Sequence, residues 1–252
     1  MNDWLVFGIA YLYVITVLLV GEIFRKKFEK SSEFTRKIIH IFAGFSVYTV
    51  LFFDHPWVAN LVALTFVILL YLASPSSPVK ALREMFGTME RAEEGEKLWG
   101  PFYYSVSILV LTLIFTLGGL VELGFERFYW LAAAPLTIMY LGDGLAPIIG
   151  KKYAKRTYTV IKGAKRSIIG SLTLFAAGFG GAIFAMWFNG ILAIEVNYGA
   201  SFVILTWDLI IIYSLIAAAI GTLIEFFSPL GIDNLTVPMG TTAILCMIFF
   251  LI

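Results

Sequence analysis

The segment Trp4–Phe24 reads WLVFGIAYLYVITVLLVGEIF and carries one charged side chain, that of Glu22. An α-helix rises about 1.5 Å per residue, so roughly 20 consecutive apolar residues cross the ~30 Å hydrocarbon core of a bilayer. The segment therefore predicts a membrane-spanning helix. It lacks a basic leader and is followed by further apolar segments, so we expect it to be retained rather than removed as a secretory signal.

Apolar segments of similar length recur along the chain, although the last is short. We predict spans at Trp4–Phe24, Lys37–Phe53, Trp57–Ala73, Phe102–Leu123, Tyr129–Ile149, Ser167–Phe188, Phe202–Phe227 and Asn234–Ile252. They must be helical, because unpaired backbone groups cannot face lipid. The 252 residues are 60% hydrophobic and 14% charged, whereas soluble domains carry roughly 25% charged residues. We expect an all-α, polytopic integral membrane helix bundle with seven to eight transmembrane helices, forming a single domain over residues 1–252.

The single cysteine, Cys246, lies in an apolar segment, which argues against a disulfide framework or a thiolate metal cluster. The net charge of +1 does not indicate a class of partner. We expect the partners to be the lipid bilayer and small molecules, with no nucleic acid.

Basic residues are distributed unevenly between the two faces of the predicted bundle. One face carries 17 of the 18: Arg25, Lys26, Lys27, Lys30, Arg36, Lys37, Lys80, Arg83, Arg91, Lys97, Lys151, Lys152, Lys155, Arg156, Lys162, Lys165 and Arg166. Arg127 lies on the other face. Because Lys and Arg mark cytoplasmic loops, we expect this multi-pass protein to have its N-terminus outside. The seventh loop, Ser228–Asp233, would then be cytoplasmic.

Polar side chains at the ends of the spans gather on that same face. They are Arg36, Lys37, His40, Asp143, Lys151, Lys152, Lys165, Arg166, Ser167, Glu225, Asp233 and Asn234. An ionisable group in or beside a span costs several kcal/mol unless it has a partner or water, and it often marks a functional site. Simpler interpretations exist for single members, since a basic pair can be topogenic and His40 can be a packing residue.

Two of these elements have a geometry that can be predicted. Arg36, Lys37 and His40 have i, i+3 and i, i+4 spacing and therefore share a helix face. Asp143 lies in the run Gly142–Pro147, where glycine and proline suggest a broken helix whose freed backbone groups line a polar cavity. A kink with a capped aspartate is the simpler interpretation.

The combination of carboxylates and cations suits a polyphosphate bound through a divalent cation. Mg²⁺ takes one or two carboxylates plus phosphate oxygens, and Asp143 and Asp233 could supply them. The run Lys165–Ser171, KRSIIGS, opens the sixth predicted span with cations, hydroxyls and a glycine. The start of a helix attracts anions through its free N–H groups and its dipole. No Walker, GxGxxG or HExxH motif is present.

Four elements between residues 36 and 238 resemble the group formed by dolichol kinase, phytol kinase and CTP-dependent diacylglycerol kinase. Arg36–Gly44, RKIIHIFAG, looks like its RKxxHxxxG element, and Gly142–Gly150, GDGLAPIIG, resembles GDxxAxxxG. Lys165–Ser171 resembles KSxEGS, with Ile169 where the family usually has Glu. Glu225 together with Asp233–Pro238 resembles E…DNxxxP.

The resemblance implies roles for individual residues. Asp143 and Asp233 would be catalytic or metal-binding carboxylates, with Glu225 as a further candidate metal ligand. His40 or one of the aspartates would accept the proton of the substrate hydroxyl. Nucleotide and phosphate contacts would come from Arg36, Lys37, Gly142, Gly144, Gly150, Lys151, Lys165, Arg166, Ser167, Gly170, Ser171 and Asn234.

The resemblance also implies a reaction, transfer of the terminal phosphate of CTP to a long-chain isoprenoid alcohol of the phytol, geranylgeraniol or dolichol type. The expected cofactor is Mg²⁺ or another divalent cation, and the expected location of the site is the cytoplasmic face. One alternative is a CTP-dependent cytidylyltransferase acting on a lipid phosphate. An alternative from another class is a transporter, which would favour midplane charges and internal repeats. The residues leave open diacylglycerol as acceptor, ATP or UTP as donor, and the oligomeric state.

Overall fold

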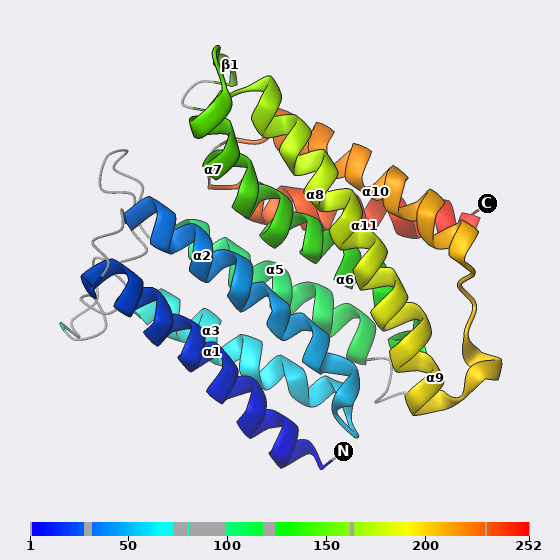
Figure 1. The fold of residues 1–252 in the computed structure, drawn as a ribbon. Helices are drawn as coiled ribbons and strands as arrows, with labels where there is room; N and C mark the ends of the chain where they lie inside the picture. Colours follow the sequence, from blue (N-terminus) through cyan, green and yellow to red (C-terminus); the bar gives the residue numbers. More distant parts are fainter. Residues whose placement is uncertain are drawn as a thin grey trace.

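The computed structural model describes residues 2–27, 32–72, 80, 99–117, 124–161, 164–229 and 231–251. Five basic residues counted in the charge asymmetry lie outside these ranges: Lys30, Arg83, Arg91, Lys97 and Lys162. Within the described ranges the chain forms eight helical runs, in the order of the eight predicted spans (Figure 1).

The first four runs are α1 (Asp3–Lys27), α2 (Ser32–Gly44) continued by the 3-10 helix η1 (Phe45–Phe52), η2 (Pro56–Val58) continued by α3 (Ala59–Leu72), and α5 (Trp99–Thr116). The fifth joins η5 (Phe125–Phe128), α6 (Trp130–Thr137), the π-helical turn η6 (Ile138–Gly142) and α7 (Asp143–Tyr153). The sixth joins α8 (Ile168–Trp187), the π-helical turn η7 (Phe188–Leu192) and α9 (Ala193–Tyr198), followed by η8 (Ala200–Phe202). The last two are α10 (Trp207–Phe227) and α11 (Asp233–Leu251).

Six of the described runs are long and apolar enough to cross a membrane: those containing α1, α5, α6–α7, α8–α9, α10 and α11. Pro56–Leu72 is a shorter apolar helix. The prediction of a helical membrane protein with several spanning helices is therefore confirmed.

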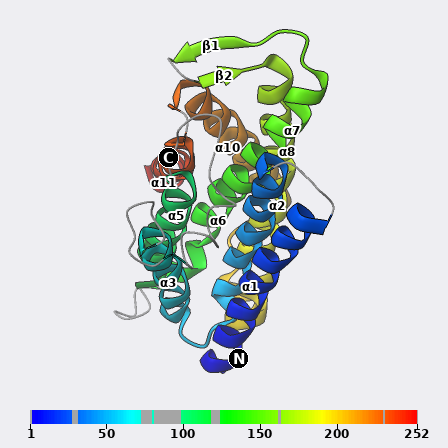
Figure 2. The same ribbon diagram turned by 90° about the vertical axis from the view of Figure 1, so that its left-hand side faces the viewer.

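A short antiparallel hairpin interrupts the helical pattern between α7 and α8. Its strands are β1 (Tyr158–Ile161) and β2 (Ala164–Arg166), with Thr159 opposite Lys165. Aromatic and β-branched residues in β1 favour a strand, but the stretch was expected to be a basic loop. Figure 2 shows the hairpin at the end of the molecule opposite the N-terminus.

The helix α6 lies at the centre of the bundle. Every residue from Trp130 to Thr137 is buried, because α6 packs against α8, α11, α10, α5 and η1. Figure 1 shows α1 and α3 at one side of the molecule and the α8–α10 pair at the other. The helix α7, which carries Asp143, continues directly from this packed centre.

Candidate functional site

Lys37 and Asp143 form a buried ion pair between α2 and α7. Lys37 Nζ lies 2.9 Å from Asp143 Oδ2, and the two side chains are only 5% and 13% exposed. A buried charge without a partner costs several kcal/mol, so each side chain makes the burial of the other tolerable. The pair brings the second and fifth predicted spans together at residues that the sequence singled out.

Pro147 gives Lys37 a second acceptor. In an α-helix the carbonyl of residue 143 would accept the N–H of residue 147, but proline has no N–H. Lys37 Nζ donates to this Asp143 carbonyl at 2.9 Å as well as to the carboxylate. One ammonium group therefore compensates both a buried carboxylate and a backbone carbonyl that proline leaves without its helical donor.

His40 lies one turn after Lys37 and faces the same residues of α7. Its Nε2 is 3.7 Å from Asp143 Oδ2 and 3.3 Å from the Met139 carbonyl oxygen. The Asp143 amide bonds to the carbonyl of Ile138, five residues back, rather than to that of Met139. In this π-helical turn the Met139 carbonyl therefore does not accept a hydrogen bond from the Asp143 amide. Such turns are frequent at functional sites.

The ring of His40 is also held from the side of α5. The ring centroids of His40 and Tyr104 are 4.5 Å apart, and the Tyr104 hydroxyl donates to the His40 carbonyl at 2.9 Å. His40 is therefore fixed by α5 and α7 together.

The glycines of the Gly142–Gly150 element are contact points between helices. A Cβ at Gly144 would overlap the side chain of Ile41, and a Cβ at Gly142 would lie 3.0 Å from the Leu174 carbonyl oxygen. A Cβ at Gly150 would lie 3.1 Å from Ser167 Oγ. The predicted break in the helix is wrong, because the backbone is helical from Ile138 to Tyr153. The glycines instead let α7 approach α2 and α8 closely.

The start of α8 has a regular cap. Ser167 is the N-cap residue, and its Oγ accepts the amide of Gly170 at 3.0 Å. Gly170 faces α7 near Gly150, while the Ser171 hydroxyl lies 3.2 Å from that of Tyr158 in the hairpin. This helix start is therefore bound to both α7 and the hairpin.

Arg166 and Glu225 form a second buried ion pair. Arg166 Nη1 lies 3.0 Å from Glu225 Oε1, and the side chains are 7% and 9% exposed. Arg166 Nε donates to the Glu225 carbonyl at 3.1 Å, and Nη2 donates to the Ser228 carbonyl at 2.9 Å. All three guanidinium nitrogens are thus directed at the end of α10.

The start of α11 repeats the arrangement seen at Asp143. Asp233 and Asn234 are buried, and Pro238 leaves the Asn234 carbonyl without its helical donor. Ser107 Oγ donates to that carbonyl at 2.7 Å, and Asn234 Nδ2 donates to the Gly100 carbonyl at 3.2 Å. In both helices a proline leaves the carbonyl four residues earlier without its helical donor, and a side chain of a neighbouring helix donates to that carbonyl instead.

The buried polar residues of the four elements converge at one end of the bundle. The Glu225 carboxylate interacts electrostatically with Asp143, Asp233 and Lys37 as well as with Arg166. Asn234 lines the same cavity as Lys37 and His40, and Arg36 lines it too. Lys151 and Lys165 are exposed at the same end, on the last turn of α7 and on β2.

The charge balance at this end suits a polyanion held through a cation. Among the residues that the structure describes, no group of three or more His, Cys, Asp or Glu side chains is placed to hold a metal by itself. Mg²⁺ does not require one, because it keeps several waters and is bound by one or two carboxylates plus substrate phosphates. The hard oxygen donors of Asp143 and Asp233 fit that chemistry.

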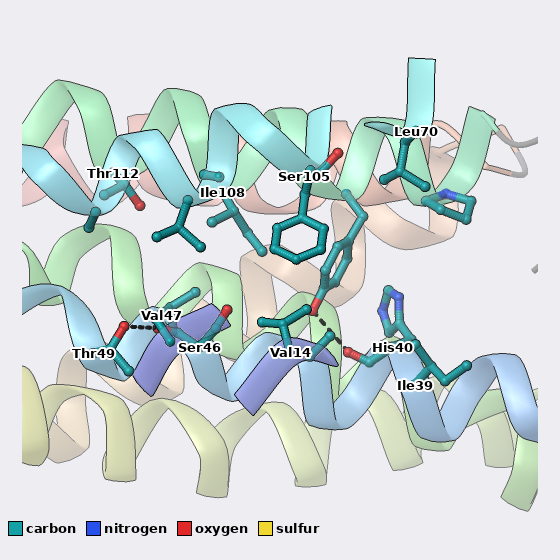
Figure 3. A pocket seen from close by; sticks show the side chains of 18 of the residues that line it. Val14, Ile39, His40, Ser46, Val47, Thr49, Leu70, Ser105, Ile108 and Thr112 are labelled. Atoms are coloured by element: carbon teal, nitrogen blue, oxygen red, sulfur yellow. Dashed lines mark hydrogen bonds between the residues drawn. The ribbon is translucent and has the colours of Figure 1, made fainter. Parts of the chain in front are cut away.

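A cavity of about 130 Å³ extends away from this polar end, between α1, α2–η1, α3 and α5 (Figure 3). Arg36, Lys37, His40 and Asn234 lie at one end of its wall, and apolar side chains make up most of the rest. The charged site is therefore continuous with an apolar space inside the bundle.

The sequence did not single out the residues of α5 that contact the site. Tyr104, Ser107 and Gly100 hold His40 and Asn234 in place through the contacts given above. Tyrosine and serine inside an apolar segment are a weak signal, and nothing in their spacing indicates which helix they face.

Comparison with known proteins gives a result in the same group as the resemblance of the four sequence elements. The chain is 29% identical to the phytol kinase of Synechocystis sp. over 241 residues, which cover 96% of this chain and 90% of that protein. The chain is a relative of the phytol kinases. This relationship confirms the resemblance predicted from the residues.

Plant proteins match less closely. A probable chloroplastic phytol kinase 2 of Glycine max is 26% identical over 231 residues, covering 89% of this chain and 68% of that protein. A probable chloroplastic phytol kinase of Triticum aestivum is 26% identical over 157 residues, covering 61% of this chain and 45% of that protein. No family model matches the chain, and no solved structure matches it.

Proposed function

We propose that this chain is a membrane kinase that transfers the terminal phosphate of CTP to the hydroxyl of a phytol-type isoprenoid alcohol. The similarity to a phytol kinase carries the proposal, because it covers 96% of the chain. A phosphotransferase with an alcohol acceptor is what the relatives' names support. CTP as the donor rests on the resemblance of the four elements.

The acceptor hydroxyl is proposed to lie at the polar end of the cavity, beside His40. Its oxygen forms the new bond to the terminal phosphorus of CTP, CDP leaves, and His40 takes the hydroxyl proton. The Asp143 carboxylate, 3.7 Å from His40 Nε2, stabilises the imidazolium that results. Lys37 fixes the position of Asp143 through two hydrogen bonds.

The donor is proposed to bind at the start of α8 and along the hairpin. Phosphoryl transfer requires mainly positioning and charge stabilisation from the protein. Exposed Lys165 and Lys151 supply cations, together with Arg36 at the end of the cavity. Arg166 holds the hairpin on α10 in this proposal, since its guanidinium nitrogens already have acceptors.

A divalent cation is proposed as the cofactor, with Asp143 and Asp233 as its protein ligands. When bound, Mg²⁺ neutralises the triphosphate and orients it for transfer. Glu225 lies within electrostatic range of both aspartates, and Arg166 compensates its charge as Lys37 compensates that of Asp143. Glu225 is therefore a further candidate ligand.

The membrane arrangement is also proposed. The α2–η1 run and the η2–α3 run would cross the membrane beside the six long helices, giving eight spans with the N-terminus outside. The excess of basic residues at the hairpin end supports a site on the cytoplasmic face in this arrangement. Cysteine labelling from each side tests this, with Lys155→Cys and the exposed loop position Ile232→Cys reacting from inside and Asn2→Cys from outside. Labelling of Ile232→Cys from outside alone would contradict the arrangement.

The decisive experiment is an incubation of the purified protein in lipid nanodiscs with geranylgeraniol or phytol and CTP labelled at its terminal phosphate, with labelled ATP in parallel. The expected product is a labelled lipid monophosphate together with CDP. A lipid phosphate acceptor that gains CMP with release of pyrophosphate would identify a cytidylyltransferase. Absence of any transfer with every nucleotide would overturn the proposed kinase activity.

A further inference from the structure

Four helical segments, α1, α2–η1, α3 and α5, each contribute one side to the cavity wall. The contributing positions on α5 are Pro101, Tyr104, Ser105, Ile108 and Thr112, whose spacing follows one side of a helix. The α2–η1 wall runs from His40 to Phe53, which at about 1.5 Å per α-helical residue and about 2 Å per 3-10 residue is on the order of 25 Å. The space is therefore long and narrow.

Charged side chains in this wall are confined to one end. Further along, Thr49 donates to the Ser46 carbonyl at 2.8 Å, and Thr112 Oγ1 lies 3.4 Å from the Tyr129 hydroxyl. Figure 3 shows His40 and Thr49 well apart along the wall. A ligand that fits has one polar head and one apolar tail.

At the end of the cavity far from His40, α3 is hydrogen-bonded to α5. Ala59 lines the cavity there, and the next residue, Asn60, is buried. Asn60 Nδ2 donates to Thr116 Oγ1 at 2.8 Å and to the Trp57 carbonyl at 2.9 Å. Ala63, one turn further along α3, lines the cavity closer to the head end.

We propose that this cavity binds the tail of the lipid alcohol and that Ala59 and Ala63 set the longest tail accepted. The proposal rests on the proposed kinase function and narrows its substrate. The wall, on the order of 25 Å long, matches the length of one phytol or geranylgeraniol tail. A dolichol-length tail exceeds it, and the two tails of a diacylglycerol would need a second cavity beside the same head site.

The test compares alcohols of different length on a cavity-shortening variant. Ala63→Phe fills the middle of the cavity, so the KM for geranylgeraniol is expected to rise about tenfold or more. The KM for the shorter geraniol and the KM for CTP are expected to stay unchanged. Matched controls are Leu64→Phe, the next residue on α3, whose side chain is 42% exposed, and Ala219→Phe on an exposed position of α10. If Ala63→Phe does not fold, Ala63→Leu takes its place.

An equal loss with geraniol and geranylgeraniol in Ala63→Phe, or wild-type turnover of dolichol-length alcohols as good as that of geranylgeraniol, would overturn the length limit. A photoreactive geranylgeraniol analogue tests binding without activity. Crosslinks are expected on Val14, Ala63 and Ile108, and to be lost in Ala63→Phe. Crosslinks confined to the outer faces of α8 and α10 would overturn the site even in an active enzyme. Crosslinks in the cavity of a protein that transfers no phosphate would instead overturn the kinase function alone.

Discussion

The two buried ion pairs of this bundle have nearly the same length and different surroundings. Lys37 and Asp143 are 2.9 Å apart, and Arg166 and Glu225 are 3.0 Å apart. Lys37 borders the cavity, with His40 beside it on the same carboxylate. The other two nitrogens of the Arg166 guanidinium donate to carbonyl groups at the end of α10.

The difference shows that burial of an ion pair does not by itself indicate function. Burying two charges is costly, and replacing a buried pair by apolar residues is often neutral for stability. The Arg166–Glu225 pair connects the hairpin to the end of α10. Apolar packing could make the same connection. The Lys37–Asp143 pair holds charge next to an apolar cavity, where reacting groups could use it.

The largest expected effect is that of Asp143→Asn. The amide keeps an acceptor for Lys37 but loses the negative charge, so kcat is expected to fall by about 10²-fold or more. The protein is expected to fold with a lowered melting temperature, because Lys37 stays buried without its counter-charge. Asp233→Asn is expected to lower kcat by a similar factor. Steady-state kinetics with CTP and geranylgeraniol measure the loss, and Asp208→Asn, on the exposed start of α10, is the control. Near-wild-type kcat in Asp143→Asn would remove it from the mechanism.

The second prediction compares apolar replacement of each pair. Glu225→Leu alone leaves Arg166 buried without its carboxylate and is expected to destabilise the protein by about 3–5 kcal/mol. The double variant Arg166→Met with Glu225→Leu is expected to recover most of this stability and part of the activity. Lys37→Met with Asp143→Leu is expected to be stable and inactive. Thermal unfolding and kcat for the three variants give the result, and activity in the Lys37–Asp143 double variant would remove the distinction between the two pairs.

A smaller effect is expected from the exposed cations. Lys165→Ala removes a charge beside the start of α8 and is expected to raise the KM for CTP about tenfold, as for loss of a charged hydrogen bond. Lys155→Ala and Lys26→Ala are expected to change it little, because these side chains are solvated and serve orientation. Equal small effects in all three would mean that the basic residues are topogenic only.

The smallest expected effect is that of Pro147→Ala. Alanine restores an N–H for the Asp143 carbonyl, so Lys37 loses the need to donate there and its position loosens. A few-fold decrease in kcat is expected, with unchanged KM for CTP. Pro238→Ala is the matched control. The N–H that it restores faces the Asn234 carbonyl, which accepts from Ser107, a residue with no role in the proposed reaction. A larger loss in Pro238→Ala than in Pro147→Ala would contradict this role for Lys37.

The sequence was sufficient to predict the helical runs, because long apolar segments have one outcome in a membrane. It also singled out Lys37, His40 and Asp143. It did not indicate that Lys37 would pair with Asp143 or that Arg166 would turn toward Glu225, since these contacts depend on how each helix is rotated against its neighbours. The hairpin was missed because its four-residue strand is too short to outweigh the surrounding charges.

The π-helical turn between Thr137 and Asp143 has a consequence for insertions and deletions. Such a turn is equivalent to one extra residue in an α-helix, and successive α-helical residues are about 100° apart around the axis. Deleting Leu141 would remove the extra residue, so a regular α-helix would keep Asp143 close to its present direction. Regular α-helix through this stretch with every residue kept would instead rotate Asp143 by about that angle relative to α6. The carboxylate would then leave Lys37, and Gly150 would leave α8. The direction of the central acid thus depends on the i→i+5 turn that absorbs one residue.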